Sequence, residues 1–452
     1  MMQSIQNLFR IRAGEGRLVI VLGAILLLNT LALELGDVVA VAGFLGSVDV
    51  SNILILWIID MILVIGVGAV QSFIVDRYAR LKLLRTLCLI FAGTFAALLG
   101  LFALGISDTI SYGLLFLLVE QQNIFLPLIF WILASEYMSA SQSRRLFPVI
   151  ASFSAVGQIV GLSLAAIAPF ILRAIGVDNA ALLVLNMGLY LTSALILTIG
   201  LRGVEPMNAA LDRKNEPRAP WRETVTRGFE FIGKIMSLRY LTIATFCAVI
   251  VLTIIDYHFL VVATQTFADD TGGGFQTFYG VYRLIMTVLI ILMQNLVANR
   301  LIERYGIKNA LLAVPIVAMA GALFVVLGSG LFVVATARAA IRLVNSAIDL
   351  PAQKAFLSIM PEDIRGAVSI FTDGYTFAIG AIISSVVIGA LIIGAQAATL
   401  TPETLYLMVG LLFGVVGIIA VRAMYRHYDM TLFNWRLKRR QRTSSVLKDL
   451  EF

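Results

Sequence analysis

The sequence predicts an all-α polytopic membrane protein with twelve transmembrane helices, arranged as two pseudo-symmetric six-helix bundles. The chain of 452 residues is 60% apolar and 13% charged, with a mean hydropathy of +0.94. A water-soluble domain has about twice that share of charged residues, so this chain has too little polar surface to cover a soluble body. Two sequence signals that recur after about half the chain predict the division into two bundles.

Twelve apolar runs are long enough to cross a bilayer, which takes about 20 mostly apolar residues. They lie roughly over residues 17–45, 50–74, 83–106, 110–137, 146–172, 180–201, 240–264, 276–298, 309–330, 332–357, 366–392 and 403–424. We therefore expect an N-terminal six-helix bundle over 1–201 and a C-terminal one over 240–428. A cytoplasmic linker with an amphipathic helix is expected over 202–239, and a basic cytoplasmic tail over 429–452.

The first repeated signal is a charged loop. Asp76-Arg77-Tyr78-Ala79-Arg80-Leu81-Lys82 follows the second run, and Glu303-Arg304-Tyr305-Gly306-Ile307-Lys308 follows the eighth, 227 residues later. The second signal is Leu126-Pro127, which recurs as Leu350-Pro351 after 224 residues. The two registers agree within three residues, which favours duplication of an ancestral six-helix unit.

Basic residues predict the orientation of the chain. They gather before the first run and in the loops after the second, fourth and eighth runs, as at Arg10, Arg80, Arg145 and Arg304. The alternate loops are mainly polar or acidic. Because Lys and Arg are retained on the cytoplasmic side, we expect both termini to be cytoplasmic.

The linker over 202–239 has three prolines and eight basic against five acidic residues. Apolar positions from Trp221 to Met236 recur near helical spacing, with basic residues opposite, which favours an amphipathic helix on the inner leaflet. A flexible linker is the alternative.

Composition argues against several other classes of protein. Cys88 and Cys247 both lie inside apolar runs, and the two histidines are too few for a metal cluster. The chain contains no phosphate-binding G-x-x-x-x-G-K-[ST] loop. Its basic residues are confined to short loops, which argues against nucleic-acid binding. We expect no enzyme activity, no metal and no cofactor.

The tenth run has the richest set of polar residues at membrane depth. Arg338, Arg342, Asn345 and Asp349 fall at i, i+4, i+7 and i+11, on one face of a regular helix. Charges at this depth are costly and tend to face a watery cavity or a partner. The arginines suit a carboxylate or phosphate, so these residues are candidates for binding an anionic substrate. The alternative is a ladder of internal ion pairs, Arg342 with Asp349 or with acids on other helices.

Further substrate-binding candidates lie on two other runs. Glu120 and Asn123 share a face of the fourth run, and Arg283 lies beside Tyr279 in the eighth. Gly157-x-x-x-Gly161 in the fifth run is instead typical of close helix packing.

Acidic residues inside the runs have two possible roles. They either take up and release a coupled proton, or they balance the charge of the arginines. The candidates for coupling are Glu34, Asp37, Asp256, Asp349 and Glu136. Asp256 and His258 are two residues apart and cannot face the same way on a helix.

The arrangement as a whole resembles the major facilitator superfamily. The resemblance rests on six plus six helices, cytoplasmic ends, a central loop and the D-R-x-x-R-x-K run. It implies that the charged loops form a cytoplasmic gate between the halves, and that helices one, four, seven and ten line a central cavity. The implied gate residues are Asp76, Arg77, Arg80, Lys82, Glu303, Arg304 and Lys308. Two glycines usual in the motif are replaced by Ser72 and Ala79.

A narrower resemblance is to the ATP/ADP translocase (nucleotide transport protein) family. It rests on Phe130 to Glu136, on Arg145-Leu146-Phe147-Pro148, on the small-residue helix Ala155 to Ala166 and on Pro361 to Gly374. Glu136 matches the functional glutamate at the end of the family's fourth helix. Where the family has a lysine just before an aspartate in the first helix, this chain reads Glu34-Leu35-Gly36-Asp37.

We therefore expect a secondary active transporter that moves a small anionic metabolite by alternating access, with a nucleotide or phosphate ester as candidates. One alternative is a proton-coupled carrier of a cationic or neutral solute, and another is a non-transporting sensor or scaffold. The expected partners are the substrate, a proton or counter-substrate, and membrane lipids. We expect a monomer in the bacterial cytoplasmic (inner) membrane.

Overall fold

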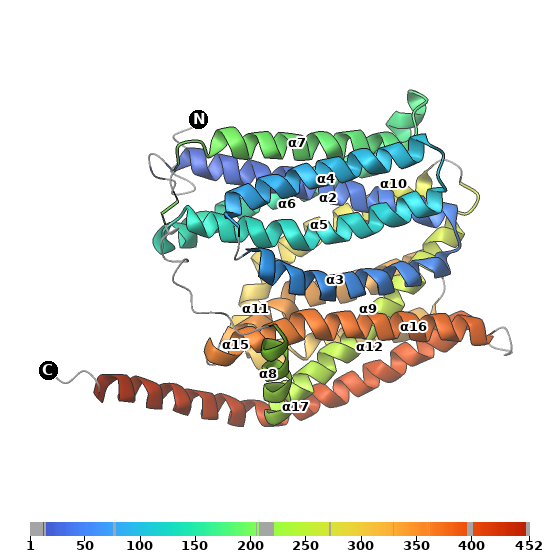
Figure 1. Cartoon of the computed structure of the whole chain (residues 1–452). Coiled ribbons are helices and arrows are strands. Elements are labelled where there is room, and N and C mark those ends of the chain that lie inside the picture. The colour runs from blue at the N-terminus through green and yellow to red at the C-terminus, as the bar shows by residue number, and fades with distance from the viewer. Residues whose placement is uncertain are drawn as a thin grey trace. The chain divides into compact units, whose positions relative to one another are not determined.

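The computed structural model describes residues 12, 15–75, 78–204, 206–207, 221–270, 273–328, 330–358, 360, 362–395 and 401–448 (Figure 1). Within these ranges the regular structure is entirely helical. Two compact units emerge from the contacts within the chain. Unit 1 contains Met1–Leu56, Gly66–Arg218 and Phe267–Val288, and unit 2 contains Trp57–Ile65, Ala219–Thr266 and Leu289–Phe452.

Unit 1 is organised around its first long helix. Its elements are α2 (Gly16–Ser47), η1 (Val50–Asn52), parts of α3 (Ile53–Val75), α4 (Arg80–Ala103), α5 (Asp108–Glu136), α6 (Ala140–Ala174), η2 (Asn179–Ala181), α7 (Leu182–Gly200) and most of α10 (Gly274–Met293). Helix α2 packs against α5, α6 and α7, which surround it with apolar side chains. Leu22, Ile25, Leu35 and Val38 of α2 are fully buried as a result.

Close contact between α6 and α2 depends on glycine. A Cβ atom at Gly157 would overlap the Thr30 hydroxyl and the Leu27 carbonyl, and one at Gly161 would lie 2.7 Å from the Leu31 carbonyl oxygen. The Thr30 hydroxyl also donates to the Ser154 carbonyl across this contact at 3.1 Å. The glycine pair therefore serves helix packing, and it places the next turn of α2, which contains Glu34, against α6.

Helix α10 is fixed within unit 1 by a polar contact and by a small residue. Gln276 donates to the Ala165 carbonyl of α6 at 3.1 Å and accepts from Asn179 at 2.9 Å. One turn later, a Cβ atom at Gly280 would lie 3.0 Å from Ala166. These contacts set the position of Arg283, which follows Gly280 by three residues.

Unit 2 is organised around α9 (Met236–Thr266), which packs against α8, α12, α13, α16 and α17. Its other elements are α8 (Trp221–Lys234), η4 (Gln294–Ala298), α11 (Asn299–Ala310), α12 (Ala313–Leu327), α13 (Leu331–Val344), η5 (Asn345–Asp349), α14 (Leu350–Ser358), α15 (Glu362–Ser369), η6 (Ile370–Thr376), α16 (Phe377–Ala395) and α17 (Pro402–Lys448). Glycine permits the break inside α11, because Gly306 has a φ of 78° that other residues rarely adopt.

The tenth apolar run is not one regular α-helix. The segment η5 between α13 and α14 is a π-helix, in which the Leu350 amide bonds to the Asn345 carbonyl five residues earlier. Pro351 follows, and it has no N–H to continue the ladder. A π-turn takes more residues than an α-turn. The polar stripe expected on a single face is therefore interrupted after Arg342.

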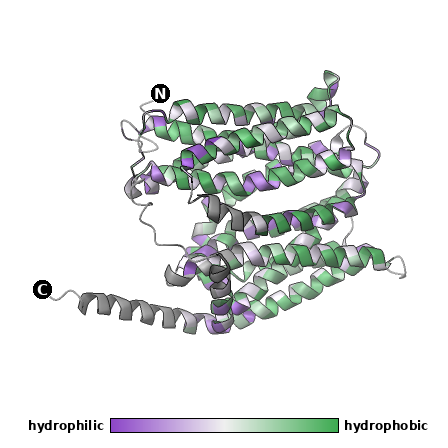
Figure 2. Ribbon diagram, in the orientation of Figure 1, coloured by the Kyte–Doolittle hydropathy of each residue, from purple (hydrophilic) through white to green (hydrophobic). Residues whose placement is uncertain are grey.

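Ten helices of the described residues are long and apolar enough to cross a membrane, or up to eleven if a bent pair counts as one span. The bent pair is 300–310 with Ala313–Leu327, at 80°. The run expected over 50–74 falls on η1 and α3, and within it Val50–Gly66 is found as a shorter apolar helix. Figure 2 shows hydrophobic residues along most of the coloured part of the long helices.

Candidate functional site

Unit 1 contains an arginine between two carboxylates. The Arg283 guanidinium of α10 donates to Glu34 Oε2 of α2 at 2.7 Å, and its other terminal nitrogen pairs with Asp37. The same guanidinium lies 5.8 Å from the ring centroid of Tyr279. We call Glu34, Asp37 and Arg283 the acidic triad, since one cation and two anions leave a formal charge of −1. Four of the residues predicted from the sequence thus come together in one cluster.

Unit 2 contains the opposite arrangement, a carboxylate between two arginines. Asp256 of α9 accepts from Arg338 Nε at 2.7 Å, and from Arg342 Nε and Nη2 at 3.1 and 2.5 Å. We call Asp256, Arg338 and Arg342 the basic triad, since two cations and one anion leave a formal charge of +1. The Arg338 guanidinium also lies 4.2 Å from the ring centroid of Phe259.

The two arginines of the basic triad differ in exposure. The Arg338 side chain is 7% exposed, whereas that of Arg342 is 47% exposed. Arg342 presents a fork to Asp256, the geometry in which guanidinium groups bind carboxylates and phosphates. The cluster therefore holds the Asp256 carboxylate, and Arg342 is its more exposed arginine.

The remaining polar residues of the tenth run have other partners. Asn345 is half-buried, and Asp349 is buried and accepts from Gln353 at 2.6 Å. Gln353 lies in turn 3.5 Å from the Thr245 hydroxyl. Within the described ranges Asp349 forms no ion pair. Of the two alternatives expected for Arg342, an ion pair with Asp349 or with an acid on another helix, the structure contains the second, with Asp256.

On α5 the two predicted residues are less buried than a neighbour that the sequence did not point to. Glu120 is half-buried and Asn123 is exposed. Gln122 is fully buried, and neither end of its side-chain amide has a hydrogen-bond partner among the described residues. An uncharged amide in an apolar run gives little signal in a sequence, although burying it unpaired is costly.

Two of the predicted gate residues form ion pairs, one in each unit. Arg80 at the start of α4 lies 3.3 Å from Glu136 at the end of α5. Lys308 of α11 donates to Asp429 of α17 at 2.6 Å and lies 3.7 Å from the Tyr425 ring centroid. Three further candidates, Lys82, Glu303 and Arg304, are exposed, and Asp76 and Arg77 lie outside the described residues.

An ion pair in front of α2 was not anticipated from the sequence. Glu15, just before α2, accepts from Arg145 at 2.6 Å and from Gln142 at 3.2 Å. The hydrogen bond from Arg145 lowers the pKa of the Glu15 carboxyl to about 2, against the opposing effect of burial. Gln142 also completes the capping box of α6 with Ser139.

The described residues hold no group of three His, Cys, Asp or Glu side chains that could bind a metal ion. His258 bonds instead to the Tyr406 hydroxyl at 2.7 Å, on a different face of α9 from Asp256.

Solved structures with the same fold are transporters. A variant of the nucleoside transporter NupG is 15% identical over 91% of this chain and 100% of its own, with a TM-score of 0.66. A bacterial homologue of the human lysosomal transporter Spinster is 15% identical over 94% and 98%, with a TM-score of 0.56. A bacterial homologue of the iron transporter ferroportin is 14% identical over 91% and 99%, with a TM-score of 0.60. The expected major facilitator fold is confirmed.

Comparison with curated protein sequences finds no match. The sequence profile described as TLC ATP/ADP transporter matches residues 78–348, which is more than half of the chain. Together with the ten apolar helices, these findings show a multi-pass membrane transporter and not an enzyme. The narrower resemblance expected from the sequence is thus confirmed, and the chain belongs to the TLC ATP/ADP transporter family.

Proposed function

We propose that the protein is a secondary transporter of a small organic anion, with a nucleotide or another phosphate ester as the preferred class. The twelve apolar runs would form two six-helix bundles that work by alternating access. We place it as a monomer in the bacterial cytoplasmic membrane with both termini in the cytoplasm, as the basic loops indicate.

The observation that carries the proposal is the binding of Asp256 by Arg338 and Arg342. Asp256 already accepts from both guanidinium groups, which supports an oxyanion as their ligand, and Arg342 is exposed enough to meet a soluble one. A phosphate group would compete with Asp256 for the same donors. The net positive charge of the basic triad supports an anion over a cation at this position.

The acidic triad supports charge balance as the role of Glu34 and Asp37. Both carboxylates already pair with Arg283. Removing a partner from a buried ion pair is costly, so the pairing with Arg283 supports a structural role for both acids.

The test is uptake of radiolabelled ATP, and separately of inorganic phosphate, into proteoliposomes preloaded with ADP. Arg342→Ala should lower uptake at least about tenfold while expression and thermal stability change little, because the fork that holds the oxyanion is lost. Arg342→Lys should recover only part of the activity, since lysine has no fork. Arg422→Ala is the control, because this exposed arginine of α17 forms no ion pair with a described residue.

Unchanged kinetics in Arg342→Ala would remove this residue from the site. A protein that takes up no anion, and whose thermal stability no nucleotide or phosphate changes, would favour a sensor or scaffold.

A proton-coupled carrier is the second candidate function, and Asp349 is the observation in its favour. This buried carboxyl contacts the Gln353 amide and no described cation, so it can exchange a proton without breaking an ion pair. Proton coupling predicts that uptake follows an imposed pH gradient in liposomes without internal ADP. Exchange predicts that uptake requires internal ADP and ignores the gradient.

A further inference from the structure

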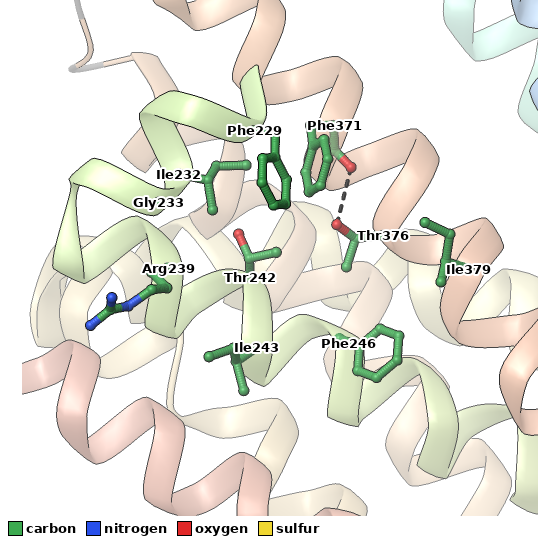
Figure 3. A pocket seen from close by; sticks show the side chains of 10 residues that line it. All are labelled: Phe229, Ile232, Gly233, Arg239, Thr242, Ile243, Phe246, Phe371, Thr376 and Ile379. Atoms are coloured by element: carbon green, nitrogen blue, oxygen red, sulfur yellow. Dashed lines mark hydrogen bonds between the residues drawn. The ribbon is translucent and has the colours of Figure 1, made fainter. Parts of the chain in front are cut away.

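Unit 2 contains a cavity of about 320 Å³ at the start of α9, away from the basic triad. Figure 3 shows side chains of α8, α9, η6 and α16 around it. Its walls are mainly apolar, and the lining residues are Phe229, Ile232, Gly233, Arg239, Thr242, Ile243, Phe246, Phe371, Thr376 and Ile379. The volume lies at the lower end of the range for small-molecule sites.

One polar atom in this cavity has no hydrogen-bond partner among the residues that the structure describes. The buried Thr242 hydroxyl has no hydrogen-bond partner among the described residues, and in Figure 3 it points toward α8. On the same helix, Thr253 and Thr264 donate to the carbonyls four residues earlier, at 2.9 and 2.8 Å. A buried hydroxyl without a hydrogen-bond partner is costly, so a ligand that forms a hydrogen bond with it would be favoured.

A cation stands at the edge of the same cavity. Arg239 lies in the first turn of α9, and its guanidinium is directed outward in Figure 3, 5.4 Å from the Tyr240 ring centroid. Arg239 forms no ion pair with any residue in the described ranges. Lys234 of α8 differs, because it is already paired with Glu230 at 3.4 Å.

The level of the cavity in the membrane indicates the kind of ligand. Helix α9 is a candidate span that begins at Met236, so Arg239 lies near the headgroup region. Phe229, Ile243 and Ile379 are large apolar side chains of the lining that remain exposed. An opening with apolar walls and a basic rim at this depth matches an anionic lipid, whose chain is apolar and whose phosphate is charged.

We propose that this cavity binds an anionic phospholipid. One acyl chain lies along the apolar walls, the phosphate bonds to Arg239, and an ester or glycerol oxygen bonds to the Thr242 hydroxyl. The lipid then bridges α8 and the π-helical segment η6, in which Thr376 already donates to the Phe371 carbonyl at 3.0 Å. Membrane composition would thereby act on the start of the helix that continues as α16.

The test compares the purified full-length chain in nanodiscs of phosphatidylcholine with and without phosphatidylglycerol, together with native mass spectrometry of retained lipid. The wild type should retain phosphatidylglycerol in preference to phosphatidylcholine. Arg239→Gln should weaken this retention about tenfold, as expected for a lost charge-assisted hydrogen bond. Ile243→Trp should fill the cavity and reduce retention of both lipids. Lys234→Gln is the matched control and should retain phosphatidylglycerol as the wild type does.

Several results would overturn the proposal. Equal retention of the two lipids, or an equal loss in Lys234→Gln and Arg239→Gln, would exclude Arg239 as the headgroup site. Thermal stabilisation by soluble glycerol 3-phosphate as strong as that by the whole lipid would show a soluble phosphate ligand instead. If the variants do not fold, cross-linking of a photoactivatable phosphatidylglycerol to the wild type tests where the lipid binds. Labelling of α8, α9 or η6 supports the site, and labelling elsewhere refutes it.

Discussion

Asp256 binds Arg342 through both carboxylate oxygens, at 3.1 and 2.5 Å, and one of these oxygens also accepts from Arg338. A single carboxylate thus neutralises half of the positive charge of Arg338 and Arg342. The proposed anion site therefore already holds an anion that belongs to the protein.

Removing that anion should make the stability of the protein depend on added anions. Asp256→Asn leaves two guanidiniums without a counter-charge, so we expect a loss of about 3–5 kcal/mol at most, because Arg342 is partly exposed. Sodium sulfate or phosphate should restore more stability to this variant than to the wild type. Thermal unfolding in detergent at constant ionic strength measures both effects.

The control for this experiment is Asp429→Asn, which breaks a pair whose carboxylate side chain is 76% exposed. Pairs of this kind contribute about 1 kcal/mol or less. Equal anion dependence in Asp256→Asn and in the wild type would contradict the interpretation of the basic triad.

The Arg80–Glu136 pair allows two roles of Glu136 to be separated. If Glu136 acts only through Arg80, then Arg80→Gln, Glu136→Gln and the double variant should reduce transport to the same extent. A double-mutant cycle on uptake rates measures the coupling. Additive losses would show that Glu136 also acts independently, on substrate or on a proton.

The Glu15–Arg145 pair predicts that the stability of unit 1 falls at acid pH. The pKa of Glu15 is lowered from 4.5 to about 2 in the folded protein. The unfolded chain therefore binds a proton first, and this contribution to stability is complete above pH 4.5 and is lost as the pH falls toward 2. Thermal unfolding between pH 6 and pH 3 should show a shallower acid loss in Glu15→Gln than in the wild type. Identical pH profiles would refute the contribution.

The contact of α6 with α2 predicts a steric effect at Gly157. Gly157→Leu should cost about 1–3 kcal/mol or more, because the new side chain meets the Leu27 backbone and cannot be accommodated by rotation. Gly188→Ala is the matched control, since no described atom outside the neighbouring backbone of its own helix lies within 4 Å of its Cβ position. That substitution in α7 should be neutral or stabilising by about 0.5–1 kcal/mol. Fluorescence-detected size exclusion after heating would compare the two variants, and equal stability would argue against close packing at Gly157.

The sequence by itself determined the helical membrane architecture, the family and the residues rich in chemistry. Ten of the helices in the described residues are long and apolar enough to span a membrane, because the length of an apolar run and its cost in water are properties of the chain alone. Charges at membrane depth were equally visible, since each one breaks an otherwise apolar run.

Only the tertiary structure decided which charges meet. Regular helical spacing would place Arg342 and Asp349 on one face, but the π-helix η5 changes that register. Arg342 forms its ion pair with Asp256 of another helix instead. Arg283 likewise finds Glu34 and Asp37 nearly 250 residues away in the sequence. The physical reason is that periodicity fixes the direction of a side chain around its own helix. The choice of partner depends on which helices pack together, as the glycines at 157, 161 and 280 allow in unit 1.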